Sequence, residues 1–316
     1  MIDYKALLYD CTPLEVFRRD RKEGALSHAY ALFGDDFDAM DWIMREMVKI
    51  AVCKEGGCGE CAACRALEGG VHPDVKFYQG KLDVAGVEEI VEDSGKYSVE
   101  GGRKIYIISE LDKTLPAAQN KLLKTVEEPP DGVMFIMGII KPSAVTETLK
   151  SRCKKLYYTG VDQRRLEEAL SAEYGESDNV ARAAAYAGGN ISRAVKFAAD
   201  GEFAMEADNI ISLLGSMAKS GGVAREEIRL KQDKDHVLRY LDVTEIVLDM
   251  IEKYKRGLTR GSGGISLIAK GFNHAALAQC EYLVNDCRKR MESNCAPSAV
   301  LDTLLFGILE VKYKCR

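Results

Sequence analysis

Four of the ten cysteines lie within twelve residues, with the spacing Cys-x4-Cys-x2-Cys-x2-Cys. They are Cys53, Cys58, Cys61 and Cys64, and three glycines lie among them. Thiolates are preferred ligands of structural zinc, and glycine lets a short loop bend its side chains onto one centre. The pattern therefore predicts a tetrahedral zinc site, with an iron–sulfur cluster as the alternative. Four protein ligands leave no position open for water, so the expected role of the ion is structural.

A single arginine, Arg152, follows a predicted strand–helix–strand unit. The apolar runs 105–108 and 133–140 have the length and composition of buried strands, and the amphipathic helix between them ends at Pro129-Pro130. Such a unit implies a parallel sheet with a right-handed crossover. A guanidinium keeps its charge and presents a fixed fork of donors, which suits a phosphoryl group. The simpler interpretation is one more exposed cation near Lys150, Lys154 and Lys155.

The residues around this unit resemble a known family. The segment LLKTVEEPP at 122–130, the strand after it and the triplet Ser151-Arg152-Cys153 closely resemble the core of bacterial DNA polymerase III clamp-loader subunits. These are AAA+ proteins of the gamma/tau and delta-prime types, and HPDVKFY at 72–78 is a further match. The resemblance implies that Arg152 is an arginine finger that acts in trans on ATP bound by the adjacent subunit.

The same resemblance places a phosphate loop of the form GxxxxGK[ST] between a strand at 29–33 and a helix from about residue 37 to 52. Aligned from Gly34, the second glycine is Ala39, the lysine is Met40 and the hydroxyl residue is Asp41. A phosphate loop works through bare backbone N–H groups, a lysine charge and a hydroxyl on magnesium. Four aspartates stand here instead, so their negative charges would repel a polyphosphate. We therefore expect no ATP in this site.

Two further catalytic positions of the family also differ in this chain. The strand at 105–108 ends in Ser109-Glu110, where an active AAA+ ATPase has an aspartate that organises magnesium followed by a glutamate that polarises water. Past the next strand, Ile139-Ile140 replaces the polar sensor residue of the family's ATPases. Loop lysine, magnesium carboxylate and polar sensor are thus all missing or weakened.

The expected fold is α/β followed by all-α. Residues 1–160 would form a RecA-like AAA+ domain with the zinc module inserted at 53–64, residues 161–202 a small helical lid, and residues 203–316 a helical collar for oligomerisation. The family's zinc module usually has a wider gap after its first cysteine, so we expect an altered geometry at Cys53. Arg193 matches the second sensor arginine of the lid, but without nucleotide we expect it to be a structural or interface cation.

The amino-acid composition limits the classes of protein to which this chain can belong. Hydrophobic residues make up 47% and charged residues 29% of the 316 residues, as in ordinary globular proteins. No apolar run approaches the roughly 18 residues of a membrane span, and residues 1–30 are too charged for a signal peptide, so a cytoplasmic protein is expected. The net charge of −5 disfavours coating of nucleic acid through the overall field.

The resemblance implies a delta-prime-like subunit without ATPase activity of its own, with structural zinc and Arg152 as its chemical groups. The implied partners are gamma/tau-type ATPase subunits and the delta subunit, and through the assembly the sliding clamp and primed DNA. A first alternative is a gamma/tau-type ATPase with a divergent phosphate loop. A second is a zinc-dependent nucleic-acid binder outside replication, which the acidic charge and the lack of interleaved aromatic and basic residues near 53–64 disfavour.

Overall fold

The structure, a computed structural model, describes residues 2–99, 102–216, 233–257 and 263–314. It divides into two compact units. The first comprises residues 1–165 with 190–192, and the second comprises residues 166–189 with 193–316. The lid and collar boundaries expected at 160 and 202 stay predictions.

The first unit is built on a parallel sheet of five strands in the order β2-β3-β4-β1-β5. The strands β1, β3 and β4 are buried along their whole length. Because both faces of a parallel sheet are covered, such strands read as continuous apolar runs, and this is why the sequence revealed them. The bounds of the strands are β1 Ala29–Phe33, β2 Val75–Tyr78, β3 Lys104–Ile108, β4 Val133–Ile139 and β5 Lys154–Tyr157.

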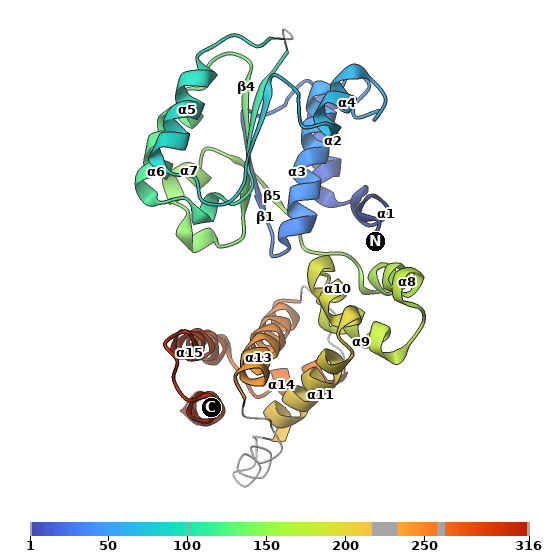
Figure 1. The fold of residues 1–316 in the computed structure, drawn as a ribbon, viewed down its shortest axis with the longest axis vertical. Coiled ribbons are helices and arrows are strands. Elements are labelled where there is room, and N and C mark those ends of the chain that lie inside the picture. Colours follow the sequence, from blue (N-terminus) through green and yellow to red (C-terminus); the bar gives the residue numbers. More distant parts are fainter. Residues whose placement is uncertain (1, 100–101, 217–232, 258–262, 315–316) are drawn as a thin grey trace. The chain divides into compact units, whose positions relative to one another are not determined.

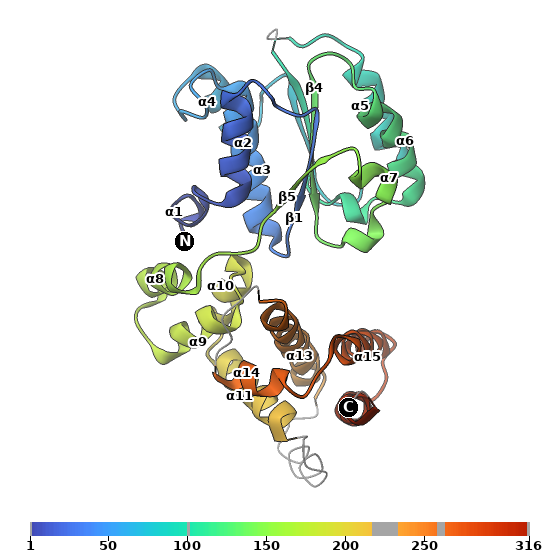
Figure 2. The same ribbon diagram turned by 180° about the vertical axis from the view of Figure 1, so that it is seen from behind.

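Helices cover both faces of this sheet (Figures 1 and 2). On one face, α3 packs against β4 and against α1, α2 and α4. On the other face, α5 and α6 place Val87, Ile90, Leu122 and Val126 on the sheet, and α7 packs against α6. The bounds are α1 Tyr4–Leu8, α2 Thr12–Lys22, α3 Phe37–Val52, α4 Ala62–Glu68, α5 Val84–Ser94, α6 Pro116–Glu127 and α7 Glu147–Lys150, with 3-10 turns at Leu111–Lys113 and Pro142–Ala144.

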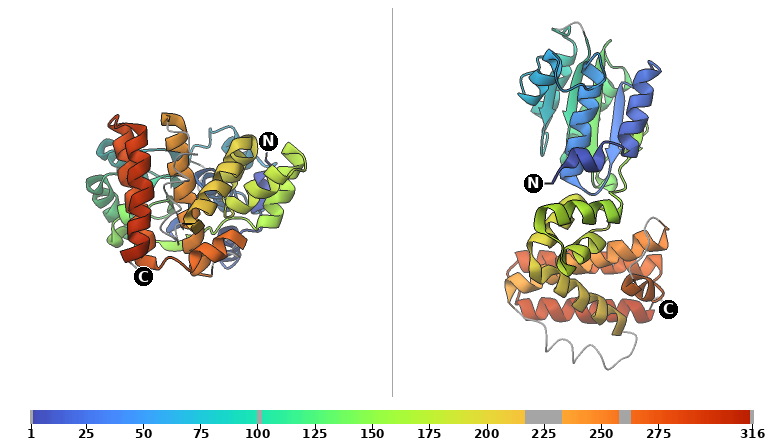
Figure 3. Two further views of the ribbon diagram at one scale, coloured as in Figure 1. Left: turned by 90° about the horizontal axis from the view of Figure 1, so that it is seen from below. Right: turned by 90° about the vertical axis from the view of Figure 1, so that its right-hand side faces the viewer.

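The second unit is helical throughout its described residues. Its longest helix, α13, contacts α9, α11, α14, α15 and α16, and buries an apolar stripe that includes Val237, Leu241, Val247 and Ile251. Figure 3 shows the long helices of this unit lying side by side. The helices from residue 163 onward are α8 Gln163–Tyr174, α9 Asp178–Tyr186, α10 Ile191–Ala199, α11 Gly201–Ser216, α13 Lys234–Lys255, α14 Gly263–Ala269, α15 His274–Glu292 and α16 Pro297–Lys314.

The predicted fold class is confirmed in its architecture: a parallel α/β core with a four-cysteine insertion is followed by helical segments. Among the helices in the described ranges, none has both the length and the apolar character that crossing a membrane requires.

Candidate functional site

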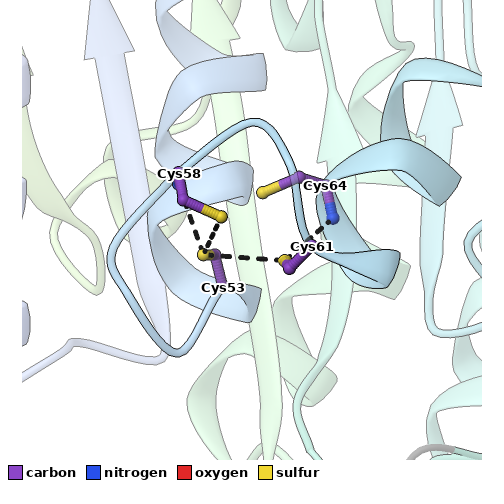
Figure 4. A group of neighbouring side chains, drawn as sticks. All are labelled: Cys53, Cys58, Cys61 and Cys64. Atoms are coloured by element: carbon purple, nitrogen blue, oxygen red, sulfur yellow. Dashed lines mark hydrogen bonds between the residues drawn. The ribbon is translucent and has the colours of Figure 1, made fainter.

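The four cysteines lie together in the insertion between α3 and α4. Cys53 is the C-cap of α3, and Cys61 is the N-cap of α4, where its sulfur accepts the backbone N–H of Cys64 at 3.5 Å. All four sulfur atoms lie within 4.8 Å of one another. The sulfur of Cys53 is 3.6 Å from that of Cys58 and 3.8 Å from that of Cys61. Figure 4 marks both contacts with dashed lines. The short gap after Cys53 thus leaves its sulfur within the group.

These separations fit one tetrahedral ion. A zinc ion with bonds of about 2.3 Å to four sulfurs holds those sulfurs about 3.8 Å apart. An iron–sulfur cluster places several irons and sulfides between its cysteines, so a group this tight suits a single ion better. Disulfides are absent from the group, because bonded sulfurs would lie about 2.05 Å apart. The four thiols can therefore hold one zinc ion.

The surroundings of the thiols already favour ionisation of one of them. Burial raises the pKa of the Cys53 thiol, but backbone N–H donors from Cys58, Gly57 and Glu55 outweigh it, so the pKa of Cys53 lies below its ordinary value. Burial raises the pKa of Cys64, and the neighbouring thiol groups raise it further. Since a thiolate at Cys53 disfavours a second one beside it, the group needs a cation before all four sulfurs can ionise.

The degenerate phosphate loop is filled by its own carboxylate. Asp36 is only 1% exposed, and its Oδ1 accepts the backbone N–H of Ala39 at 3.2 Å as the N-cap of α3. Its Oδ2 accepts the backbone N–H groups of Ile191 at 2.6 Å and Ser192 at 3.2 Å, and the Ser192 hydroxyl donates to Oδ1 at 2.6 Å. Residues 190–192 belong to the same unit as the loop. One carboxylate thus serves two helix N-termini, the places where proteins commonly bind phosphate.

The two residues that replace the loop lysine and hydroxyl are also engaged. Met40 is 1% exposed, and its sulfur would lie 2.8 Å from a Cβ atom placed on Gly34, so the thioether packs against the glycine turn. Asp41 pairs with Arg45 at 2.6 Å and accepts the Ser109 hydroxyl at 3.2 Å. The loop therefore presents an apolar side chain and a neutralised carboxylate where the family's lysine and hydroxyl would meet phosphate and magnesium.

The candidate pair Ser109 and Glu110 lies at the end of β3. Ser109 is buried beside Asp41, and Glu110 is 8% exposed and forms an ion pair with Lys113 in the following 3-10 turn. Glycine at 138 is required next to them, because a Cβ atom there would lie 2.4 Å from the Ser109 carbonyl oxygen. Ile139 is buried in β4, and its carbonyl accepts the N–H of Gly34 at 3.4 Å. The structure thus brings the loop, Ser109 and the former sensor position together.

Arg152 lies elsewhere on the same unit, in the turn between α7 and β5. Its side chain is 38% exposed and forms an ion pair with Glu127, the last residue of α6. The guanidinium also donates to the Thr148 carbonyl at 2.8 Å and to the Ser151 hydroxyl at 3.4 Å. In the described part of the chain its partners therefore come from α6 and from α7 and the turn after it. The arginine is thus held in a defined position, with its side chain partly exposed.

Arg193, the position of the second sensor, pairs with Asp249 of α13 at 3.4 Å and donates to the Ala187 carbonyl at the same distance. These contacts lie within the second unit. In these contacts Arg193 ties α10 to α13 and to the chain before α10.

Sequence reasoning missed two contacts that define these sites. Ile191, which donates to Asp36, lies 155 residues further along the sequence. The ion pair between Glu127 and Arg152 joins the end of α6 to the turn after α7. The four aspartates after Gly34 indicated only that negative charge would repel a phosphate there. An aspartate directly before a helix is a frequent N-cap, and this is the local signal by which the capping role of Asp36 could have been found.

Comparisons with known proteins agree with the fold and the motifs. A family model described as DNA polymerase III, delta subunit, matches residues 11–161. A DNA polymerase III delta-prime subunit of Bacillus subtilis is 31% identical over 194 residues, which are 60% of this chain and 59% of that protein. A tau/gamma subunit of Haemophilus influenzae is 30% identical over 156 residues, 48% of this chain and 23% of that protein.

Among solved structures, a gamma subunit-related protein of DNA polymerase III from Thermotoga maritima covers 95% of this chain and 99% of that chain, with a TM-score of 0.43 and 13% identity. The chain spans less than two thirds of the length of the relatives that it matches in sequence. The matched part holds the cysteine group, the loop and Arg152. The chain is thus similar in sequence to DNA polymerase III delta-prime subunits and is related to gamma/tau subunits.

Proposed function

We propose that this chain is a delta-prime-type subunit of the DNA polymerase III clamp loader that binds no ATP and supplies Arg152 in trans. In this proposal it assembles with gamma/tau-type ATPase subunits and a delta subunit, and Arg152 completes the ATP site of a gamma/tau-type neighbour. ATP at that site drives loading of the sliding clamp onto primed DNA. The four cysteines hold a structural zinc ion.

The observation that carries the proposal is the Asp36 carboxylate. It accepts the N–H groups of Ala39, Ile191 and Ser192, which are the kind of donors that a nucleotide phosphate uses in an active loop. A polyphosphate would have to displace an intramolecular partner that is always present at high effective concentration. It would also meet Met40 in place of a lysine. In this proposal the chain therefore neither binds nor hydrolyses ATP at its own loop.

Arg152 supports the second half of the proposal. Its guanidinium is anchored on two sides by Glu127 and the Thr148 carbonyl, and the remaining part of the side chain is exposed. An anchored arginine loses less side-chain entropy when it meets a phosphoryl group than a freely rotating one does. An arginine finger supplied in trans raises turnover at the site that it completes by a factor on the order of 10³–10⁵.

The test is Arg152→Ala in a loader reconstituted from this chain with gamma/tau-type and delta subunits of the same organism. We expect loss of the clamp-stimulated turnover at one ATP site and a large loss of clamp loading on primed DNA. Arg152→Lys should fall close to the alanine variant, because lysine lacks the planar fork. Lys155→Ala removes another exposed cation from the next strand and should behave as wild type.

Size-exclusion chromatography must first show that each variant still assembles. If an assembled Arg152→Ala loader hydrolyses ATP and loads clamps as wild type does, the finger assignment is wrong. ATP turnover by the isolated chain would instead favour the alternative of a gamma/tau-type ATPase with a divergent loop.

A further inference from the structure

Arg21, on helix α2, reaches the loop that carries the first two cysteines. Its Nη2 donates to the carbonyl oxygens of Cys53 and Lys54, the second at 2.8 Å. A Cβ atom placed on Gly56 would lie 3.5 Å from Nη1 of the same guanidinium. The planar head of Arg21 therefore lies directly on the backbone of residues 53–56. Clamp loading and the arginine finger give this contact no role.

The two carbonyl groups need such a donor because of where they lie. Cys53 is the C-cap of α3, and the last carbonyls of a helix have no partner within the helix. The Gly56 N–H also donates to the Cys53 carbonyl, at 3.0 Å, so that carbonyl closes the turn that leads to Cys58. A cation at a helix C-terminus is further stabilised by the helix dipole. Arg21 thus fixes the direction in which the chain leaves α3 toward the other thiols.

The charge of a filled metal site adds a second reason. Four thiolates around one divalent ion carry a net charge of about −2. Arginine cannot lose its proton in a protein, so Arg21 brings a permanent positive charge to this anion whatever the pH. It acts on the same loop whose N–H groups already point at the Cys53 sulfur, with the Cys58 N–H at 3.4 Å.

The helix that carries Arg21 is itself held firmly. The preceding residue, Asp20, is 3% exposed and accepts Nζ of Lys154 at 2.6 and 2.7 Å, and the hydroxyl of Tyr30 at 2.7 Å. These partners belong to β5 and β1, so the end of α2 is tied to the sheet. Arg21 therefore connects the cysteine loop to a fixed base.

We propose that Arg21 is a positioning residue of the metal centre: it holds residues 53–56 so that Cys53 and Cys58 meet the other two thiols, and it slows release of the ion. The inference rests on the zinc role proposed above. It does not depend on ATP, on Arg152 or on any partner subunit.

The test uses the full chain loaded with zinc, with Arg21→Gln, Arg21→Lys and the matched control Arg19→Gln. Arg19 lies on the same helix, is exposed, and loses the same charge in its variant. The rate of zinc transfer to a chromophoric chelator is measured for each protein. Loss of a residue that orients a metal ligand typically costs about 10–100-fold in affinity. We expect transfer from Arg21→Gln to be faster by a factor in that range, Arg21→Lys to lie between, and Arg19→Gln to match wild type.

The spectrum of the cobalt-substituted chain is the second readout, since its visible bands report tetrahedral thiolate geometry directly. Arg21→Gln should shift or weaken these bands, and Arg19→Gln should leave them unchanged. Equal transfer rates and equal spectra for Arg21→Gln and wild type overturn the inference while leaving the zinc role intact. A wild-type chain that retains no zinc overturns both. If Arg21→Gln does not fold, Arg21→Lys decides: a wild-type rate overturns the inference, and a faster one supports it.

Discussion

Helix α3 starts at the acidic loop and ends at the cysteine group, and its two ends satisfy their polar groups in different ways. At the start, Asp36 accepts the helical N–H of Ala39 and the N–H groups of residues 191 and 192. At the end, the Cys53 sulfur has backbone N–H donors and other thiols around it, and the Cys53 carbonyl accepts from both Arg21 and the Gly56 N–H. At the start of the helix a carboxylate of the chain caps the Ala39 N–H, whereas at its end the four thiols can all ionise only with a cation.

The difference shows that backbone geometry alone does not decide whether a site takes a ligand. A glycine turn between a strand and a helix N-terminus is present at Gly34, as in any phosphate loop. Here, however, the Asp36 carboxylate that follows the turn accepts the helical N–H of Ala39, at which a phosphate could otherwise bind. At the cysteine loop, the partners of the sulfurs among the described residues are backbone N–H groups and one another. Substitutions at each end of α3 test this difference.

The largest effect is expected at the cysteine end. Cys64→Ser removes a buried ligand, so the chain should lose its bound zinc and several kcal/mol of unfolding free energy, because metal binding energy contributes directly to folding. Cys295→Ser changes an exposed cysteine outside the group and serves as the control. Metal content and urea unfolding measure both effects. Zinc retained at wild-type content in Cys64→Ser would mean that the four thiols are not the ligand set.

A smaller but clear effect is expected at the other end of α3. Asp36→Ala removes a helix cap and leaves the N–H groups of Ile191 and Ser192 without their acceptor, at a cost of about 2–4 kcal/mol. Asp38→Ala removes one exposed bond to the Ser192 hydroxyl and should cost less than about 1 kcal/mol. Hydrogen exchange should accelerate at residues 191 and 192 only in the first variant. Equal exchange in both variants would show that Asp36 does not hold this segment.

A third change tests whether the two ends of α3 are independent of the opposite face of the sheet. Burial raises the pKa of Asp93. Hydrogen bonds from Tyr106 and Lys104 and the charge of Lys76 lower this pKa by more, so the pKa of Asp93 in the folded chain lies below its ordinary value. The ionised Asp93 therefore stabilises the folded chain at pH values above about 3.9, the pKa of an aspartate in the unfolded chain. This stabilisation is lost as the pH falls through the lower pKa that Asp93 has in the folded chain.

Asp93→Asn should accordingly cost about 1–2 kcal/mol at pH 7, and the difference from wild type should shrink as the pH falls below about 4. Urea unfolding at a series of pH values measures this dependence. Zinc transfer and hydrogen exchange at residues 191 and 192 should stay as in wild type. A change in either would show that the faces of the sheet are coupled.

The elements that could be predicted from sequence are those whose signals are local. The strand at 29–33 and the helix at 37–52 were predicted with the bounds that the structure has, because an apolar run and a capped amphipathic pattern stand next to each other. The cysteine group was visible in its spacing alone. The strand β5 was not predicted, since Lys154-Lys155-Leu156-Tyr157 is short and half charged, and it exists through pairing with β1.

Contacts between distant residues could not be read from the sequence. Nothing near Asp36 indicates that its acceptor atoms meet residues 191 and 192, and nothing near Arg21 indicates that it reaches residues 53 and 54. Each depends on how strands and helices pack. The charges near Gly34 therefore predict that this loop repels phosphate, but they do not predict that the Asp36 carboxylate accepts the N–H groups of residues 191 and 192.

Calorimetric titration of the isolated, zinc-loaded chain with magnesium and ATP tests the central claim most directly. A gamma/tau-type subunit of the same organism is the positive control. We predict no binding heat with nucleotide up to about 1 mM, because Asp36 and Met40 occupy the site from within. Saturable binding with a micromolar dissociation constant would contradict the account, since it would require that Asp36 yield its partners to a phosphate.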